Sequence, residues 1–390
     1  HLKEVKKAYQ YIKCTLKDPK NLTIAIKNWY DFTNLNAYVL KWSIVGDNGK
    51  MLAKGEQSIE VAPHATTEVS LGGVRLPWNI REAYLNLSWT PKKKSAFIGT
   101  DDEVAYDQFV LPANSQYRPT LAKLSEKPEI QIDPKTGALT SYIYEGQEYL
   151  ASPVRLSLYR PATDNDNREK KGGAKVWRKL GLNHLVQRVL SVKTSGHTTY
   201  SEVKLLNDKN DTIGSATFEY TIRKDGILSV QTRFVPDTTF VSSLARVGLV
   251  FEMPHSFNRV TYLGRGEHET YADRKLSGRI GIYHTDAERM FHYYVRPQAT
   301  GNRTDVRWMQ VSDELEKGLS VWGEKPFEFS VSPFTDENID AAGHINELKR
   351  NGTVTVHLDA LQSGVGTATC GPGVLAPYLV LSLIHISEPT

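Results

Sequence analysis

Alternation of apolar and polar residues with a period of two is the feature that most constrains this chain of 390 residues. Successive side chains of a β-strand point to opposite faces of a sheet, so a run with this period predicts a half-buried strand. Strand and helix patterns do not alternate repeatedly along the chain, which argues against a doubly wound parallel sheet and a (β/α)8 barrel. The sequence therefore predicts an all-β protein with antiparallel sheets, and its clearest strands lie at 22–26, 38–44, 216–222 and 354–358.

Local patterns add a hairpin and little helix. The stretch 216–234 consists of two alternating runs joined through Lys224-Asp225-Gly226. Glycine readily adopts the positive φ that a tight turn requires, so this stretch predicts a β-hairpin. The pattern at 174–182 allows one or two helical turns, and residues 4–12 also fit a helix by pattern.

One domain boundary is visible in the composition of the chain. A run of turn formers, Pro112-Ala113-Asn114-Ser115, is followed by mostly polar residues up to Glu129. A chain of this length also exceeds what a single hydrophobic core usually serves. We therefore expect an immunoglobulin-like β-sandwich over 1–112, a linker over 113–125 and a larger β domain over 126–380.

Charge and composition narrow the classes of partner. The formal net charge is +4, but the basic residues are interspersed with acidic ones, and the run at 92–94 is too short to follow a nucleic-acid backbone. No apolar run approaches the roughly 20 residues that span a bilayer. The two cysteines, Cys14 and Cys370, form neither a disulfide framework nor a metal cluster. We expect no nucleic-acid partner and no membrane partner.

Seven short motifs follow one another in a specific order along the chain. They are EVKKAYQ at 4–10, NWYDF at 28–32, EVAYDQF at 103–109, RPATDND at 160–166, GRG at 264–266, YADR at 271–274 and DALQSGVG at 359–366. In this order and at these spacings they resemble the C-terminal half of the large bacterial β-galactosidases of glycoside hydrolase family 2. In that resemblance, the first motif is a segment that leaves the catalytic barrel.

The resemblance implies both a fold and a function. The fold would be a sandwich followed by a large antiparallel supersandwich domain, similar to galactose mutarotase, that abuts the barrel and shapes the sugar site. The parent enzyme would hydrolyse terminal β-D-galactosides by a retaining mechanism with two glutamates, both in a barrel that this chain lacks. The isolated chain is therefore expected to be inactive and to hold no cofactor, whereas the parent would use Mg and Na in its barrel. Its expected partners are the N-terminal part of the same protein, the β-galactoside bound by the parent, and further copies in a homo-oligomer.

The resemblance also selects candidate residues at the rim of the sugar site. One branch of the family places a substrate-stacking tryptophan after the Gly-Val-Gly turn, where this chain has Cys370 and Gly371. We expect the loop 160–172 and the turn 366–373 to lie on one rim facing the barrel. The run Asp164-Asn165-Asp166 also fits loop residues that cap a following segment. It fits oxygen ligands of Ca²⁺ less well, and no metal site is assigned. The rim candidates are Arg160, Asp164, Asn165, Asp166, Cys370 and Gly371.

Two other functions remain open at this stage. A stand-alone carbohydrate-binding β module would need exposed aromatic residues, for which Trp78, Trp89 and Trp177 are candidates. A mutarotase-like enzyme that epimerises sugars would share the fold of the terminal domain, but fold alone does not transfer function. The last ten residues, 381–390, resemble a translated sequencing adapter and are expected to be an artefactual tail. The compartment, bacterial cytoplasm or periplasm, is not assigned.

Overall fold

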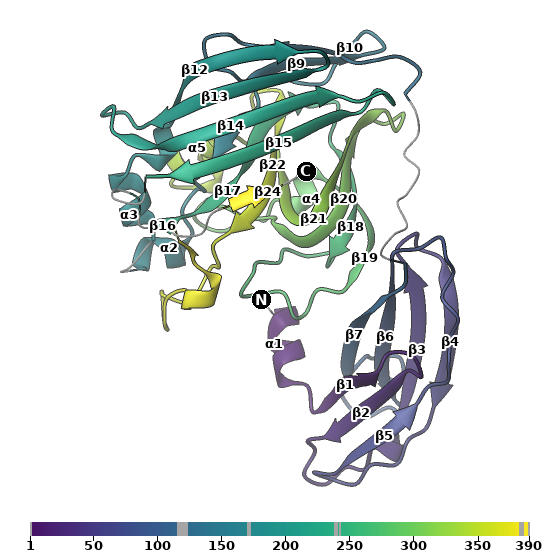
Figure 1. Cartoon of the computed structure of the whole chain (residues 1–390). Helices are drawn as coiled ribbons and strands as arrows, with labels where there is room; N and C mark the ends of the chain where they lie inside the picture. The colour runs from purple at the N-terminus through teal and green to yellow at the C-terminus, as the bar shows by residue number, and fades with distance from the viewer. Residues whose placement is uncertain are drawn as a thin grey trace. The chain divides into compact units, whose positions relative to one another are not determined.

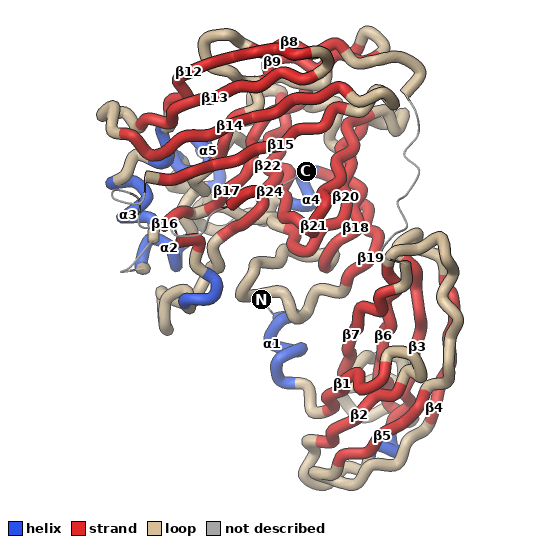
Figure 2. Tube along the Cα trace, in the orientation of Figure 1, coloured by secondary structure: helices blue, strands red, loops and turns tan. Residues whose placement is uncertain are grey.

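The computed structural model describes residues 2–114, 124–169, 173–237, 241, 243–381 and 386–388. These residues are mainly strands, drawn in red in Figure 2, with a few short helices. They divide into two compact units: the first comprises 1–121 together with 276–282, and the second comprises the remainder. Most of the predicted linker, residues 115–123, lies outside the described part.

The first unit is a sandwich of two antiparallel sheets, one of three strands in the order β1-β2-β5 and one of four in the order β4-β3-β6-β7 (Figure 1). A core of Ile, Leu, Val and Trp side chains lies between them, and alternate residues of β6, Leu85, Leu87 and Trp89, contribute to it. The elements are α1 (Leu2–Tyr9), β1 (Ile12–Asp18), β2 (Thr23–Asn28), β3 (Tyr38–Gly46), β4 (Met51–Gln57), β5 (Thr66–Ser70), β6 (Glu82–Pro91) and β7 (Ala105–Pro112).

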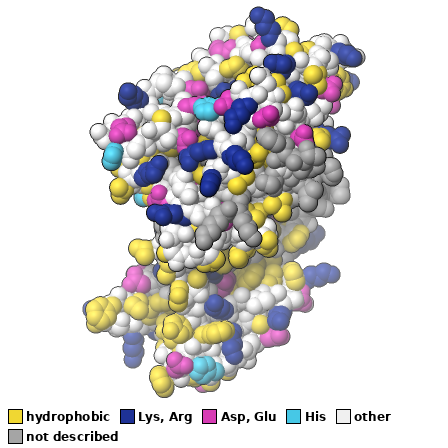
Figure 3. All heavy atoms as spheres, turned by 90° about the vertical axis from the view of Figure 1, so that its left-hand side faces the viewer, with side chains coloured by type: hydrophobic (Ala, Val, Ile, Leu, Met, Phe, Trp, Pro, Cys, Tyr) yellow, Lys and Arg dark blue, Asp and Glu magenta, His cyan; other side chains and the backbone are white. Residues whose placement is uncertain are grey.

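Helix α1 covers part of the region 4–12, whose pattern fits a helix: it ends at Tyr9, and Ile12 already begins β1. None of the side chains of α1 is buried. Several large apolar side chains of this unit are exposed, among them Tyr9, Trp29 and Phe32. On the face of the chain shown in Figure 3, basic and acidic side chains are interspersed.

The segment 276–282 completes the first unit through contacts that the sequence did not predict. The Glu4 carboxylate accepts hydrogen bonds from the backbone N–H groups of Leu276 and Ser277, at 3.0 and 2.9 Å. Gln108 both donates to the carbonyl of Ile280 and accepts from its N–H, at 2.8 and 2.7 Å. Side chains thus satisfy the backbone of a segment that reaches this unit from far along the chain.

The second unit contains a seven-stranded sheet, β11-β17-β22-β21-β20-β18-β19, and a five-stranded sheet, β12-β13-β14-β15-β24. Two small sheets, β10-β9-β8 and β16-β23, accompany them (Figure 1). The elements up to β15 are β8 (Glu129–Ile132), β9 (Leu139–Tyr144), β10 (Gln147–Glu148), β11 (Arg155–Ser157), α2 (Asp164–Arg168), α3 (Ala174–Lys179), β12 (Val186–Ser195), β13 (Thr198–Leu206), β14 (Thr212–Ile222) and β15 (Leu228–Pro236). Those that follow are β16 (Ser243–Leu244), β17 (Arg246–Pro254), β18 (Arg259–Arg265), β19 (Ile280–Asp286), α4 (Ala287–Met290), β20 (Arg303–Ser312), β21 (Gly318–Ser332), α5 (Asp336–Ala341), β22 (Thr353–Gln362), β23 (Val380–Leu381) and β24 (Ile386–Glu388).

These sheets share one large apolar core, to which β13, β14, β17, β20, β21 and β22 all contribute alternate residues. The prediction of an all-β chain built from antiparallel sheets is therefore confirmed. The predicted hairpin is β14 and β15, with Gly226 at a φ of 88° in its turn. The predicted short helix after residue 173 is α3.

The predicted artefactual tail contributes backbone pairing at two places. Leu381 pairs with Ser243 in the two-stranded sheet, and 386–388 pair with β15 at the edge of the five-stranded sheet. The remaining tail residues, 382–385, 389 and 390, lie outside the described part. Among the described residues, no helix is long and apolar enough to cross a membrane.

A substitution at Gly137 would test how closely the turn before β9 packs against the five-stranded sheet. Its φ is +68°, and a Cβ at this position would lie 1.9 Å from the Ser201 hydroxyl. Gly146 has a similar φ of +72° but no atom within 4 Å of such a Cβ. We expect Gly146→Ala to lower the free energy of unfolding by about 1 kcal/mol through backbone strain alone. Gly137→Ala should add about 1–3 kcal/mol for overpacking, measured by urea unfolding. Equal losses in the two variants would show that this contact does not constrain the turn.

Candidate functional site

The candidate rim begins at the end of β11, where the chain turns into the short helix α2. Thr163 is the N-cap of α2: its hydroxyl accepts from the N–H of Asp166, at 3.1 Å. The carboxylate of Asp166 in turn accepts from the N–H of Thr163, at 3.0 Å, which completes a capping box. The capping interpretation of the Asp-Asn-Asp run thus holds for Asp166, although the N-cap itself is Thr163.

Arg160 lies directly beneath this loop and is fully buried, with 0 % of its surface exposed. Its guanidinium makes a two-point ion pair with Asp166, at 3.0 and 2.8 Å. It also donates to the Gln362 side chain at 3.2 Å, to the carbonyl of Gly364 at 2.8 Å and to the carbonyl of Ser363. A buried charge is tolerated only when it is paired and hydrogen-bonded, so these contacts fix the loop to the end of β22.

Two side chains hold the turn that follows β22 against the loop: Asn165 of α2 and Glu169, the C-cap of α2. Asn165 donates to the carbonyl of Gly366 at 2.8 Å and accepts from the N–H and hydroxyl of Thr369, at 3.0 and 2.7 Å. Glu169 accepts from the N–H of Val374 at 3.0 Å. The two segments are about 200 residues apart in sequence, yet they form one surface.

Asp273 holds the same turn from a third segment. Its two carboxylate oxygens accept from the N–H groups of Val365 and Gly366, at 3.0 and 2.7 Å. This close approach requires a glycine at 364, because a Cβ there would lie 2.6 Å from the carboxyl group of Asp273. Side chains from two other parts of the chain, the loop 160–169 and Asp273, therefore fix the backbone of 364–374.

A polar network continues from Arg160 into the seven-stranded sheet. Gln362 donates to the side-chain oxygen of Asn302 at 3.1 Å, and Asn302 donates to the Glu328 carboxylate at 2.6 Å. Burial raises the pKa of Glu328 to about 8, against the opposing effect of the Asn302 hydrogen bond. Burial also raises the pKa of Asp359 above its usual range, although Arg246 opposes the rise. The face of the sheet beneath the rim therefore holds carboxyl groups that resist ionisation.

The structure brings all six predicted rim residues into one region but at different depths. Asp164, Cys370 and Gly371 are exposed and Asn165 is half-buried, whereas Arg160 and Asp166 are buried beneath them. The predicted adjacency of the loop and the turn is thus present for the described residues. Residues 170–172 of the predicted loop lie outside that part.

Sequence reasoning missed the residues that hold this rim in place: Glu169, Asp273 and Gln362. Asp273 and Gln362 lie in the motifs quoted above, but their role depends on contacts over about 90 and 200 residues of chain. A single sequence gives no signal for such contacts.

The three tryptophan candidates for a carbohydrate-binding platform differ in solvent exposure. Trp78 is 76 % exposed, but Trp89 and Trp177 are core residues at 0 % and 1 %. Trp177 instead packs under Arg160, whose guanidinium carbon lies 5.5 Å from the centre of its ring.

Within the described ranges, His, Cys, Asp and Glu form no cluster of three or more that could hold a metal ion. Among these described residues, Asp164 and Asp166 are therefore not part of a cluster that could bind Ca²⁺.

The raised pKa of Glu328 predicts a pH dependence of stability. In the folded chain this carboxyl group keeps its proton up to about pH 8, whereas its ordinary pKa is 4.5. Between these values the folded state binds more protons than the unfolded state, so stability should fall as pH rises. Glu328→Gln should flatten this fall, measured as the melting temperature from pH 5 to pH 8. The exposed Glu324→Gln, on the same strand, should leave the slope unchanged, and an unchanged slope in Glu328→Gln would contradict the assignment.

Comparison with known proteins gives one sequence match in each unit. Residues 125–387 match the sequence model of the β-galactosidase small chain, and residues 24–112 match that of β-galactosidase domain 4. The first match includes residues 381–387 of the predicted tail. It also contains every candidate rim residue.

Individual relatives agree with these matches. A β-galactosidase of Priestia megaterium (strain DSM 319 / IMG 1521) is 32 % identical over 381 residues, which cover 93 % of this chain and 36 % of that protein. A β-galactosidase of Actinobacillus pleuropneumoniae is 25 % identical over 381 residues, which cover 92 % of this chain and 36 % of that protein. The chain thus spans little more than a third of the length of these relatives. On the match over 125–387, the chain belongs to the β-galactosidase small-chain family.

Proposed function

We propose that this chain is the non-catalytic, C-terminal portion of a bacterial β-galactosidase that hydrolyses terminal β-D-galactosides. The observation that carries the proposal is the succession of two adjoining matches, domain 4 and then the small chain, on relatives that bear this name. The reaction would be a retaining hydrolysis by two glutamates about 5–5.5 Å apart. Both would lie in a barrel elsewhere in the parent enzyme.

The role of this portion would be to support the barrel and to shape the sugar site with the rim. Asp164, Asn165, Cys370 and Gly371 would face the substrate, and Arg160 and Asp166 would fix their backbone from beneath. This division follows from burial: a side chain with no exposed surface contributes rigidity, not a hydrogen bond to a sugar. Any Mg or Na that the parent uses would be held by the barrel, and further copies of the parent would complete a homo-oligomer.

Complementation tests the proposal most simply. We expect the purified chain alone to show no turnover of an aryl β-galactoside. We expect turnover to appear when the chain is joined to, or mixed with, the N-terminal part of its parent. Turnover by the chain alone, abolished by a substitution within 1–380, would contradict the non-catalytic role.

The same complete enzyme allows a test of the rim. Cys370→Trp and Asp164→Ala change exposed side chains, so we expect them to alter KM or aglycone preference while the melting temperature stays within about 2 °C. A matched control is Trp78→Ala, which removes an exposed side chain of the first unit. Lower melting temperatures in both rim variants with an unchanged KM would show that these residues are structural.

A further inference from the structure

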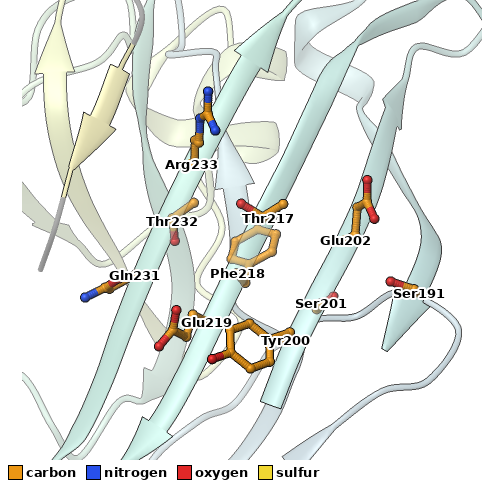
Figure 4. A pocket seen from close by; sticks show the side chains of 10 residues that line it. All are labelled: Ser191, Tyr200, Ser201, Glu202, Thr217, Phe218, Glu219, Gln231, Thr232 and Arg233. Atoms are coloured by element: carbon orange, nitrogen blue, oxygen red, sulfur yellow. The ribbon is translucent and has the colours of Figure 1, made fainter. Parts of the chain in front are cut away.

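The solvent-exposed face of the five-stranded sheet carries a groove that belongs to neither the rim nor the apolar core. Ten residues of β12 to β15 surround a hollow of about 520 Å³, and Figure 4 shows their side chains. This volume falls within the range of small-molecule sites, about 300–1,000 Å³. It is therefore large enough to hold a ligand.

The register of the sheet gives the groove its walls. One wall is a row across three strands, in which Tyr200 pairs with Glu219 and Glu219 with Gln231. The other wall is a row across four strands, in which Ser191 pairs with Glu202, Glu202 with Thr217 and Thr217 with Arg233. The two rows lie two residues apart along each strand, which is about 6.8 Å, and four strands extend over about 14 Å.

The floor of the groove is backbone. The row between the walls is Ser201, Phe218 and Thr232, and these three residues alternate with the wall residues on every strand. Phe218 belongs to the apolar core, and the Ser201 hydroxyl lies next to Gly137 on the core side. Because the sheet pairing already uses the backbone N–H and C=O groups of this row, recognition must come from the walls.

The walls fit a neutral, hydroxyl-rich ligand. Lys193 pairs with Tyr200 and so extends the first row onto β12. The acidic residues of the two rows are Glu202 and Glu219, and the basic ones are Arg233 and Lys193. The formal charges cancel, so the groove does not attract a polyanion such as a nucleic acid. Carboxylates accept hydrogen bonds, and the Arg, Lys and Gln groups donate them, while sugar hydroxyls do both. Tyr200 is 48 % exposed and offers an aromatic face to a pyranose ring.

We propose that this groove on β12 to β15 is a binding site for a short neutral oligosaccharide, lying across the strands between the two rows. The site stands independently of the proposed hydrolysis, because it needs no barrel and contains none of the rim residues. It would hold a saccharide by side chains and one aromatic face, so its affinity would be modest.

The test is sugar binding by the chain as it stands. Isothermal titration would use β-1,4-galactotriose, cellotriose and triacetylchitotriose, with a heparin tetrasaccharide as the anionic competitor. We expect at least one neutral trisaccharide to bind in the millimolar range or tighter, and the heparin fragment not to bind. Tyr200→Ala should weaken binding about tenfold, the scale of one lost aromatic contact. Tyr200→Phe, which keeps the ring, should bind within about threefold of the original chain.

A variant outside the groove separates this site from others. Phe97→Ala removes an exposed aromatic residue of the first unit and should leave binding unchanged. Absence of binding by all three neutral sugars would overturn the proposal, as would binding that survives in both Tyr200→Ala and Arg233→Gln. Preference for the heparin fragment would replace it with an anion site. None of these outcomes bears on whether the chain restores galactoside turnover to its parent.

Discussion

The guanidinium of Arg160 is the group on which the rim depends. A fully buried cation would destabilise the fold unless its charge and its hydrogen bonds were satisfied. Asp166 supplies the charge, and Gln362 with the carbonyls of 363 and 364 supplies the other acceptors. These partners come from two segments about 200 residues apart in sequence, and most strands of both main sheets lie between them along the chain. Satisfying one side chain therefore requires the loop before α2 and the turn after β22 to converge.

The seven-stranded sheet provides the platform for this convergence because its strands bury side chains on both faces. On β22, Val354 and Val356 face the apolar core, whereas His357 and Asp359 face the opposite side and are also buried. His357 meets Asp336 of α5 at 3.1 Å, and Asp359 lies 3.6 Å from Arg246. A strict alternation of apolar and polar residues usually indicates one solvated face, but here the polar face is covered. Burial on this covered face raises the pKa values of Glu328 and Asp359, whereas the neighbouring His357 lowers the pKa of Asp336 against the effect of burial.

The sequence predicts those parts of this structure that depend on local periodicity. The alternating runs became β2, β3, β14 and β22, and the glycine-containing turn became a hairpin, because strand period and turn chemistry are local properties. The adjacency of the rim segments was expected only from the family resemblance. The burial of Arg160 and Asp166 could not be predicted, since a charged residue in a loop is ordinarily exposed and its partner Gln362 lies 202 residues away.

Other features depend on pairing between distant strands. The groove on the five-stranded sheet exists because the register places Tyr200, Glu219 and Gln231 in one row, and a single sequence does not reveal that register. For Trp89 and Trp177, the suggestion of an exposed binding platform was wrong. Their size suggests a binding platform, but large aromatic residues more often fill cores, and both do so here. The first unit likewise incorporates 276–282 through side-chain contacts that no local pattern shows.

Amide hydrogen exchange of the rim backbone tests the central claim most directly. The N–H groups of Val365, Gly366, Thr369 and Val374 all bond to side chains of the loop or of Asp273. If Arg160 holds the two segments together, Asp166→Asn should raise exchange at these four amides together, while the amides of Val354 and Val356 in β22 keep their protection. Unchanged exchange at the four amides in a folded Asp166→Asn variant would contradict the account.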